Sequence, residues 1–150
     1  MTTKKTLLAV VMIAGVAMCT TTAHADDKDN GKFNNKSLKG AWGFHVHGFL
    51  AANTPNPVPA SAVGRNVYDG AGHCTSDAKL NGGGTVIPLI GTCTYTVNPD
   101  GTGTAVSTYA IGQFTTDFVL VDNANEFHFS VSDTAQPGTT VGSGIAKRQR

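Results

Sequence analysis

The chain has 150 residues, of which 14% are charged, and its formal net charge at pH 7 is +1. This near-neutral balance argues against a nucleic-acid-binding protein, because neutralising phosphates requires a basic surface. It argues equally against electrostatic attachment to an anionic membrane.

The first 25 residues have the three parts of a secretory signal peptide. Lys4 and Lys5 give a positive start, residues 7–18 form an apolar run, and Ala23-His24-Ala25 is a small-x-small cleavage site. The apolar run is shorter than the roughly 20 residues that cross a bilayer as a helix, and no later segment is longer. We therefore expect residues 1–25 to be removed, no membrane span, and export to the periplasm or the extracellular space.

The cysteines fit an exported protein. Cleavage after Ala25 leaves 125 of the 150 residues, a net charge of about −1, and Cys74 and Cys93 as the remaining cysteines. Two cysteines in an exported chain are expected to form a disulfide. A disulfide that closes a loop of about 20 residues would contribute roughly 3 kcal/mol to stability. In the alternative, Cys19 is kept and lipidated, because residues 16–19, VAMC, faintly resemble a lipobox.

The remainder of the chain predicts one all-β domain. Residues 26–37, DDKDNGKFNNKS, are polar and predict a flexible leader. In residues 38–150, short segments rich in Val, Thr, Phe and Tyr alternate with turn residues, which is typical of β-strands. Eight strands are expected, at residues 40–50, 61–69, 72–80, 85–97, 102–111, 113–121, 125–132 and 139–147.

The connections between these strands predict how they pair. Most are short turns with Gly, Asn or Asp, which favour hairpins between consecutive strands, whereas residues 51–60 form a longer loop with three prolines. Consecutive hairpins predict an eight-stranded antiparallel up-and-down β-barrel, since closure removes the exposed edges. A small β-sandwich is the alternative. Counting back from the NGGG turn at residues 81–84 places Cys74 opposite Cys93.

The leading functional hypothesis is non-catalytic binding. An eight-stranded barrel has room for its own side chains or for one small ligand, here an apolar or amphipathic molecule. Loop 51–60 would lie at the rim of the barrel. The expected lining is aromatic: Trp42, Phe44, Tyr95, Phe114, Phe118, Phe127 and Phe129. Alternatively, these side chains fill the core, and the Thr-rich outer wall meets an envelope or extracellular protein or a glycan. The oligomeric state is left open.

A third hypothesis is metal binding by His45 and His47, which share the outer face of the first strand. A metal site needs three or four protein ligands, and the nearest candidates are Glu126 and His128. On a closed barrel the eighth strand would separate these two pairs of residues. All four side chains would therefore be poorly placed to form one compact metal site.

No other pattern predicts an enzyme or a cofactor. A nucleophilic thiol beside His73 is removed by the expected disulfide, and no serine lies in a Gly-x-Ser-x-Gly motif. The aspartates Asp69, Asp100 and Asp122 lie in predicted turns, where this residue usually accepts hydrogen bonds from the backbone. An enzyme is thus not indicated, although the class stays open.

Two resemblances accompany these patterns. The segments LKGAWGF, VGRNVYDGAG, GTCTYTVNPDGTGTA, DFVLVDNANEFHF and GSGIAKRQ, within residues 38–149, resemble a family of small exported bacterial proteins that has no assigned function. More weakly, Gly40-Ala41-Trp42 resembles the Gly-x-Trp of calycins, the lipocalin and avidin type of eight-stranded barrel. The second resemblance implies a basic residue packed over Trp42, either Lys147 or Arg148.

Overall fold

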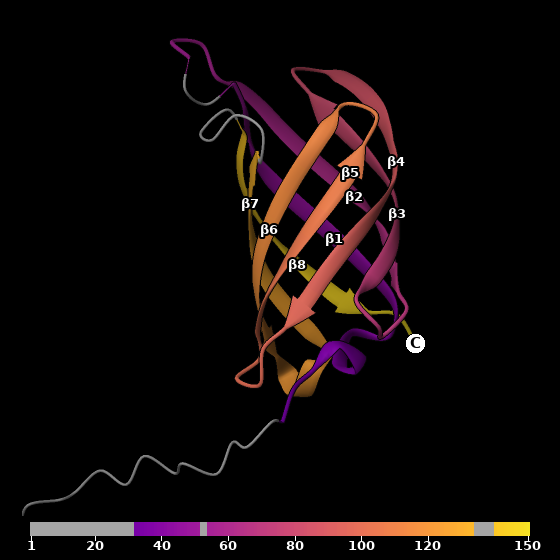
Figure 1. Ribbon diagram of the computed structural model, residues 1–150. Coiled ribbons are helices and arrows are strands. Elements are labelled where there is room, and N and C mark those ends of the chain that lie inside the picture. Colours follow the sequence, from indigo (N-terminus) through magenta and orange to yellow (C-terminus); the bar gives the residue numbers. More distant parts are fainter. Residues whose placement is uncertain (1–31, 52–53, 134–139) are drawn as a thin grey trace, which may run out of the picture.

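The computed structural model describes residues 32–51, 54–133 and 140–150, so the expected signal peptide lies outside the described residues. Eight antiparallel strands form one closed barrel in chain order (Figure 1). The strands are β1 (Gly40–Leu50), β2 (Val58–Tyr68), β3 (His73–Gly82), β4 (Thr85–Val97), β5 (Thr102–Tyr109), β6 (Gly112–Val121), β7 (Glu126–Asp133) and β8 (Thr140–Arg148). The fold expected from the sequence is confirmed. The sandwich alternative fails because β1 pairs with both β2 and β8.

The hairpin between β3 and β4 sets the register of the two cysteines. Gly83 and Gly84 form its turn, and both have the positive φ that such a turn requires, 58° and 91°. The register places Cys74 opposite Cys93, and the two sulfurs are bonded across a Cα–Cα distance of 4.9 Å. The disulfide therefore joins neighbouring strands, as the turn count predicts.

A short 3-10 helix, η1 (Asn35–Leu38), covers the lower end of the barrel in Figure 1. The Asn34 side chain caps this helix, and Asn35 Oδ1 accepts a hydrogen bond of 2.8 Å from the backbone N–H of Val97. Residues 32–37, which the sequence assigns to a flexible leader, thus include a turn that is bonded to the barrel. We call the end of the barrel that η1 covers the closed end.

Trp42 lies at the centre of the closed end. Its side chain is fully buried, and its Nε1 donates a hydrogen bond of 2.7 Å to the carbonyl of Leu38. The Arg148 guanidinium lies over the indole ring, 4.6 Å from its centroid. Of the two basic residues that the calycin resemblance suggested, Arg148 therefore occupies this position, whereas Lys147 forms an ion pair with Glu126.

Arg148 also holds the covering helix to the barrel. Its guanidinium donates hydrogen bonds of 2.6 Å to the carbonyls of Ser37 and Lys39. It donates two more, of 3.1 and 3.3 Å, to the carbonyl of Ala124, which follows β6. One side chain thus joins the N-terminal helix, the last strand and the β6–β7 connection.

Glycines make room for the aromatic rings inside the barrel. Three rings lie against a glycine on the neighbouring strand, where a Cβ atom would collide with the ring: Tyr109 against Gly91, Phe118 against Gly103, and Phe129 against Gly144. A glycine in a strand permits this close approach because it has no side chain to displace. The aromatic rings can therefore lie across adjacent strands instead of filling the barrel axis completely.

Candidate functional site

The barrel contains a cavity of about 120 Å³ between its open end and the closed end. It extends from the mouth, where Leu50 and Thr140 lie, to a floor that includes Tyr68, Phe118 and Phe127. Engineered apolar cavities of roughly 150 Å³ hold a benzene molecule, so this space is of the size of one small ring. Most of the remaining wall is apolar: Phe44, Val46, Ala60, Ala62, Leu80, Leu89, Phe114, Phe129 and Val131.

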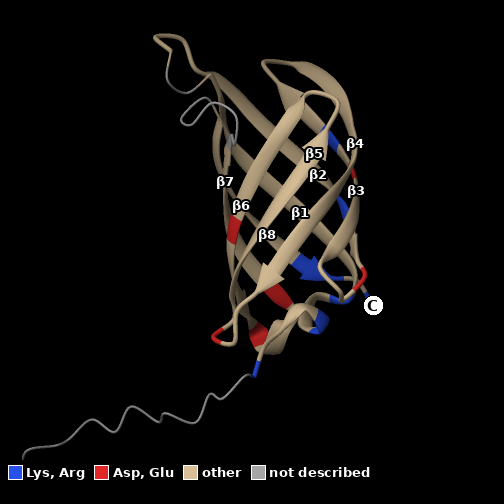
Figure 2. Cartoon of the chain, in the orientation of Figure 1, with Lys and Arg blue, Asp and Glu red and all other residues tan. Residues whose placement is uncertain are grey.

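Charge is kept away from this cavity. Among the described residues, no Asp, Glu, Lys or Arg side chain lines it. Figure 2 shows that most of the charged residues are gathered toward the closed end of the barrel. The space is therefore suited to an uncharged, largely apolar molecule, because an unpaired charge would lose its hydration there.

The seven aromatic residues expected to line the barrel divide into two groups. Five of them line the cavity: Phe44, Phe114, Phe118, Phe127 and Phe129. The other two belong to the closed end. Trp42 lies under Arg148, and the Tyr95 hydroxyl accepts a hydrogen bond of 2.9 Å from Gly70 N–H and donates one of 3.1 Å to the carbonyl of Asn35.

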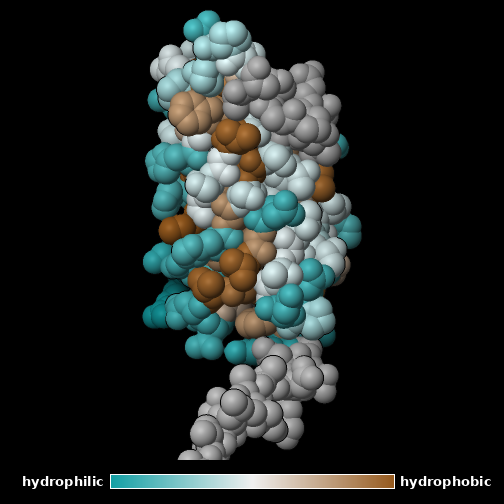
Figure 3. Space-filling model, turned by 90° about the vertical axis from the view of Figure 1, so that its left-hand side faces the viewer, coloured by the Kyte–Doolittle hydropathy of each residue, from teal (hydrophilic) through white to brown (hydrophobic). Residues whose placement is uncertain are grey.

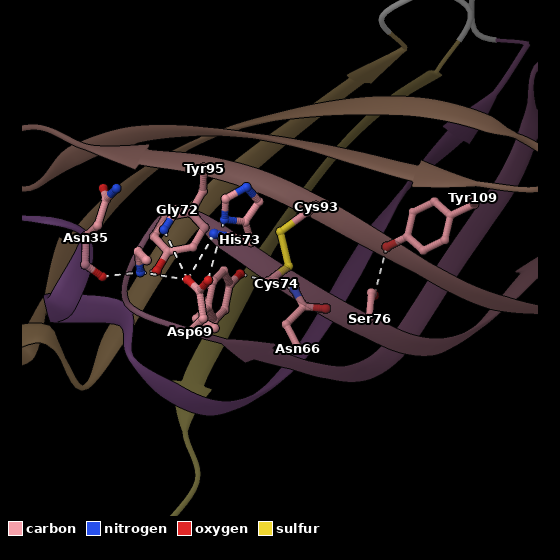
Figure 4. Close-up of a disulfide and its surroundings, with 12 residues drawn as sticks. Asn35, Asn66, Asp69, Gly72, His73, Cys74, Ser76, Cys93, Tyr95 and Tyr109 are labelled. Atoms are coloured by element: carbon pink, nitrogen blue, oxygen red, sulfur yellow. Dashed lines mark hydrogen bonds and ion pairs between the residues drawn. A yellow bond between two sulfur atoms is a disulfide. The ribbon is translucent and has the colours of Figure 1, made fainter.

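The polar side chains that line the cavity include Asn66 and Tyr109, neither of which the sequence analysis selected, and the buried Ser76 contacts Tyr109. Asn66, Ser76 and Tyr109 lie on one level of the barrel, because Asn66 is opposite Ser76, and Gly91 lies between Ser76 and Tyr109. The absent side chain of Gly91 lets the Tyr109 ring cross β4, so its hydroxyl is 2.9 Å from Ser76 Oγ (Figure 4). In the sequence, Ser76 is indicated only by its position. It is two residues from the inward-facing Cys74, so the alternation of the strand places it on the same face.

Asn66 and Tyr68 form a second polar contact in the cavity wall. Asn66 Nδ2 donates a hydrogen bond of 3.1 Å to the Tyr68 hydroxyl, and burial raises the pKa of Tyr68 to about 12. The other terminal atom of the amide, Asn66 Oδ1, is buried and has no hydrogen-bond partner among the described residues. In Figure 4 this oxygen is directed toward Ser76 and Tyr109.

The two candidate metal ligands lie on the outer face of β1, and His47 also borders the cavity. His45 and His47 are exposed on β1, with ring centroids 5.5 Å apart. Glu126 and His128 stand on β7, beyond β8, and the two Glu126 oxygens contact His128 Nε2 at 2.8 Å and Lys147 Nζ at 2.9 Å. Within the described ranges, no group of three or more His, Cys, Asp or Glu residues is arranged to hold a metal ion.

The aspartate beside His73 has a role in the turn. Asp69 Oδ1 accepts backbone hydrogen bonds from His73, Ala71 and Gly72 at 3.0, 2.6 and 3.1 Å, and these bonds hold the pKa of the carboxyl below its usual value. The neighbouring Cys74 is in the disulfide. Asp69 therefore acts as the sequence predicts for an aspartate in a turn.

The outer wall mixes apolar and polar side chains. Val63, Val86 and Ile90 are well exposed, at 64%, 60% and 72%. Val63 is opposite Lys79, and Ile90 is opposite Asp77, so charged residues separate them. Figure 3 shows the same mixture on the face that it presents, where apolar side chains are scattered among hydrophilic ones.

Comparison with known proteins supports the architecture. No protein-family model and no curated protein matches the sequence. Among solved structures, the barrel is similar to EF1p2_mFAP2b bound to DFHBI, with a TM-score of 0.52 and 15% identity over 79% of this chain and 99% of that one. It is also similar to the redesigned β-barrel mFAP0 bound to DFHBI, with a TM-score of 0.49 and 16% identity over 75% and 99%.

A third similar structure is the S-type phycobiliprotein lyase CPES from Guillardia theta, with a TM-score of 0.45 and 7% identity over 77% of this chain and 90% of that one. At these identities the similarity concerns the fold alone. Among the helices of the described residues, none is both long enough and apolar enough to span a membrane.

Proposed function

We propose that this protein is an exported, non-catalytic barrel that binds one small, largely apolar molecule. The observation that carries the proposal is the cavity of about 120 Å³, whose wall is mostly apolar and free of Asp, Glu, Lys and Arg side chains among the described residues. Binding sites for small molecules are typically concave and mostly apolar, with a few polar groups that fix orientation. Asn66 and Tyr109 are such groups.

The closed end supports the same proposal. Helix η1, Trp42 and Arg148 fill one end of the barrel, so a ligand would enter and leave through the opposite end. The similar barrel EF1p2_mFAP2b was solved with DFHBI bound, which is a precedent for a small ligand in this architecture. Fold similarity does not by itself confer function, so the proposal depends on the cavity.

Export is the second part of the proposal. Disulfides form and persist in oxidising compartments, and Cys74 and Cys93 are bonded in this protein. The features of a signal peptide in residues 1–25 agree with that environment. Native mass spectrometry of protein secreted through its own N-terminal segment would report cleavage after Ala25, the disulfide, and any metal held by His45 and His47.

The binding test uses toluene as the probe and titration calorimetry as the measurement. Ala60 lines the cavity, and its strand neighbours are Gly48 and Gly82. Ala60→Phe would therefore fill the space with a ring that resembles the ligand. We expect toluene to bind the wild-type protein and to lose at least tenfold in affinity in Ala60→Phe.

Val63→Phe is the matched control, because it adds the same ring to β2 at a position that is 64% exposed on the outer wall. We expect this variant to bind toluene within about twofold of the wild-type protein. Wild-type protein that binds no toluene, or equal losses in the two variants, would contradict the proposal. An interaction protein that uses its outer wall would then be the better hypothesis.

A further inference from the structure

The cavity wall contains a hydrogen-bond acceptor that has no partner among the described residues. Asn66 Oδ1 is buried without a hydrogen-bond partner in the part of the chain that the structure describes, while the amide nitrogen of the same side chain donates to Tyr68. A buried acceptor without a partner is unfavourable, and native proteins rarely leave one. Such an atom in the wall of a binding cavity therefore indicates what a ligand would supply.

A hydroxyl that can donate a further hydrogen bond lies near Asn66, at the same height along the barrel axis. Ser76 and Tyr109 share one hydrogen bond of 2.9 Å, in which either hydroxyl can be the donor. The hydroxyl that accepts this bond still has its own hydrogen. Asn66 and Tyr109 both line the cavity, and Asn66 is directly opposite Ser76 on the neighbouring strand, so this hydrogen and Asn66 Oδ1 lie in the same part of the barrel.

We infer that the ligand is a single-ring aromatic molecule with one hydroxyl group, of which phenol is the simplest form. This inference rests on the proposed function, and it adds the chemical class of the ligand. A hydroxyl both donates and accepts, so it donates to Asn66 Oδ1 and accepts from the Ser76–Tyr109 pair. The ring lies among Phe44, Phe114 and Phe129, and the cavity of about 120 Å³ matches one ring in size.

A carboxylate or an aliphatic amine fits this site less well. Both are charged at neutral pH, and none of the described Asp, Glu, Lys or Arg side chains lines the cavity to pair with them. A hydrocarbon ring fits the space but leaves Asn66 Oδ1 without a partner. A neutral hydroxyl on an aromatic ring meets both requirements.

The test compares phenol with toluene by titration calorimetry. The two probes have nearly the same size and differ in a hydroxyl against a methyl group. In an apolar cavity without an acceptor, the cost of removing the hydroxyl from water would favour toluene strongly. We expect wild-type protein to bind phenol at least as tightly as toluene.

The variant that tests the inferred contact is Asn66→Leu, which keeps the approximate size of the side chain and removes the acceptor together with the Nδ2 donor to Tyr68. We expect it to weaken phenol binding about tenfold and to leave toluene binding within about twofold, because one hydrogen bond is lost. Thr116→Val is the matched control, since it removes a hydroxyl from the cavity wall on β6. It should leave the ratio of the two affinities unchanged.

The outcomes separate the inference from the proposed function. If toluene binds but phenol binds more than about tenfold more weakly, the inference is overturned and the apolar binding function remains. The same holds if Asn66→Leu leaves the ratio of affinities unchanged. If neither probe binds wild-type protein, both proposals fail. Should Asn66→Leu not fold, the wild-type ratio alone decides, because it needs no variant.

Discussion

Removal of the Arg148 side chain is the sharpest test of how the closed end is held. In Arg148→Leu the carbonyls of Ser37, Lys39 and Ala124 lose their donor, and the Trp42 ring loses the guanidinium at 4.6 Å. The replacement keeps an apolar side chain over the indole ring. The variant therefore removes mainly the hydrogen bonds and the charge.

The magnitude follows from the environment of each bond. The bonds to Ser37 and Ala124 are partly buried, and a hydrogen bond from a charged donor contributes roughly 1.5 kcal/mol or more in such a setting. The bond to Lys39 is exposed and adds little. The cation–π contact adds about 1 kcal/mol. We expect Arg148→Leu to lower the free energy of unfolding by about 3 to 4 kcal/mol.

Urea denaturation followed by tryptophan fluorescence measures this loss, because Trp42 is the one tryptophan in the sequence and lies directly under Arg148. Lys147→Ala is the matched control, since the Lys147 side chain is 72% exposed in its ion pair with Glu126, and ion pairs at the surface contribute less than about 1 kcal/mol. A loss below 1 kcal/mol in Arg148→Leu, or an equal loss in the two variants, would refute this account of the closed end.

Three further predictions concern the barrel wall and its interior. Replacing both Cys74 and Cys93 by serine should lower the free energy of unfolding by about 3 kcal/mol, because the disulfide closes a loop across a sequence separation of 19; an unchanged urea midpoint would contradict this. The pKa of Tyr68 is about 12 in the folded protein and roughly 10 in the unfolded chain, so the folded state holds this proton more tightly. Its contribution is complete below about pH 10 and is lost as the pH rises to 12, about 3 kcal/mol in all, so Tyr68→Phe should flatten the fall of unfolding free energy over that interval. Gly91→Ala would add a Cβ atom that collides with the Thr108 carbonyl oxygen and with the Tyr109 ring, so it should shift both and weaken toluene binding at least tenfold; unchanged binding would show that the cavity does not depend on this glycine.

The sequence predicts the fold of this protein well because each strand has a local signal. Alternation of apolar and polar residues gives the strands, and the turn residues give their ends, so β1 and β4 begin and end at the expected residues. The Cys74–Cys93 register follows from the same turn, since the count from Gly83 and Gly84 is unaffected by the rest of the fold.

The closed end could be predicted only in part. Residues 32–37 are polar, and polarity alone suggests a flexible leader. In the structure, the polar groups of Asn34 and Asn35 bond to backbone N–H groups, which fixes the turn. That partnership joins Asn35 to Val97, a separation of 62 residues, so no local pattern could reveal it.

The positions of the interior residues along the barrel axis could also be predicted only in part. Alternation correctly indicates that Trp42 and Tyr95 face inward, but their level along the barrel axis depends on how the strands are staggered. They lie in the closed end, whereas Phe114 and Phe129 line the cavity. The polar residues Asn66 and Ser76 carry no aromatic signal, and their meeting with Tyr109 depends on the pairing of β2 with β3 and on the glycine in β4.

The position of the closed end determines how the protein is presented. Lys32, where the described chain begins, leads into η1, and the C-terminus leaves β8 beside the same helix (Figure 1). A fusion partner, an affinity tag or a solid support joined through the C-terminus would therefore stand on the far side of the molecule from the cavity mouth. A sensor surface coated with this protein through its C-terminus would present the cavity mouths to the solution.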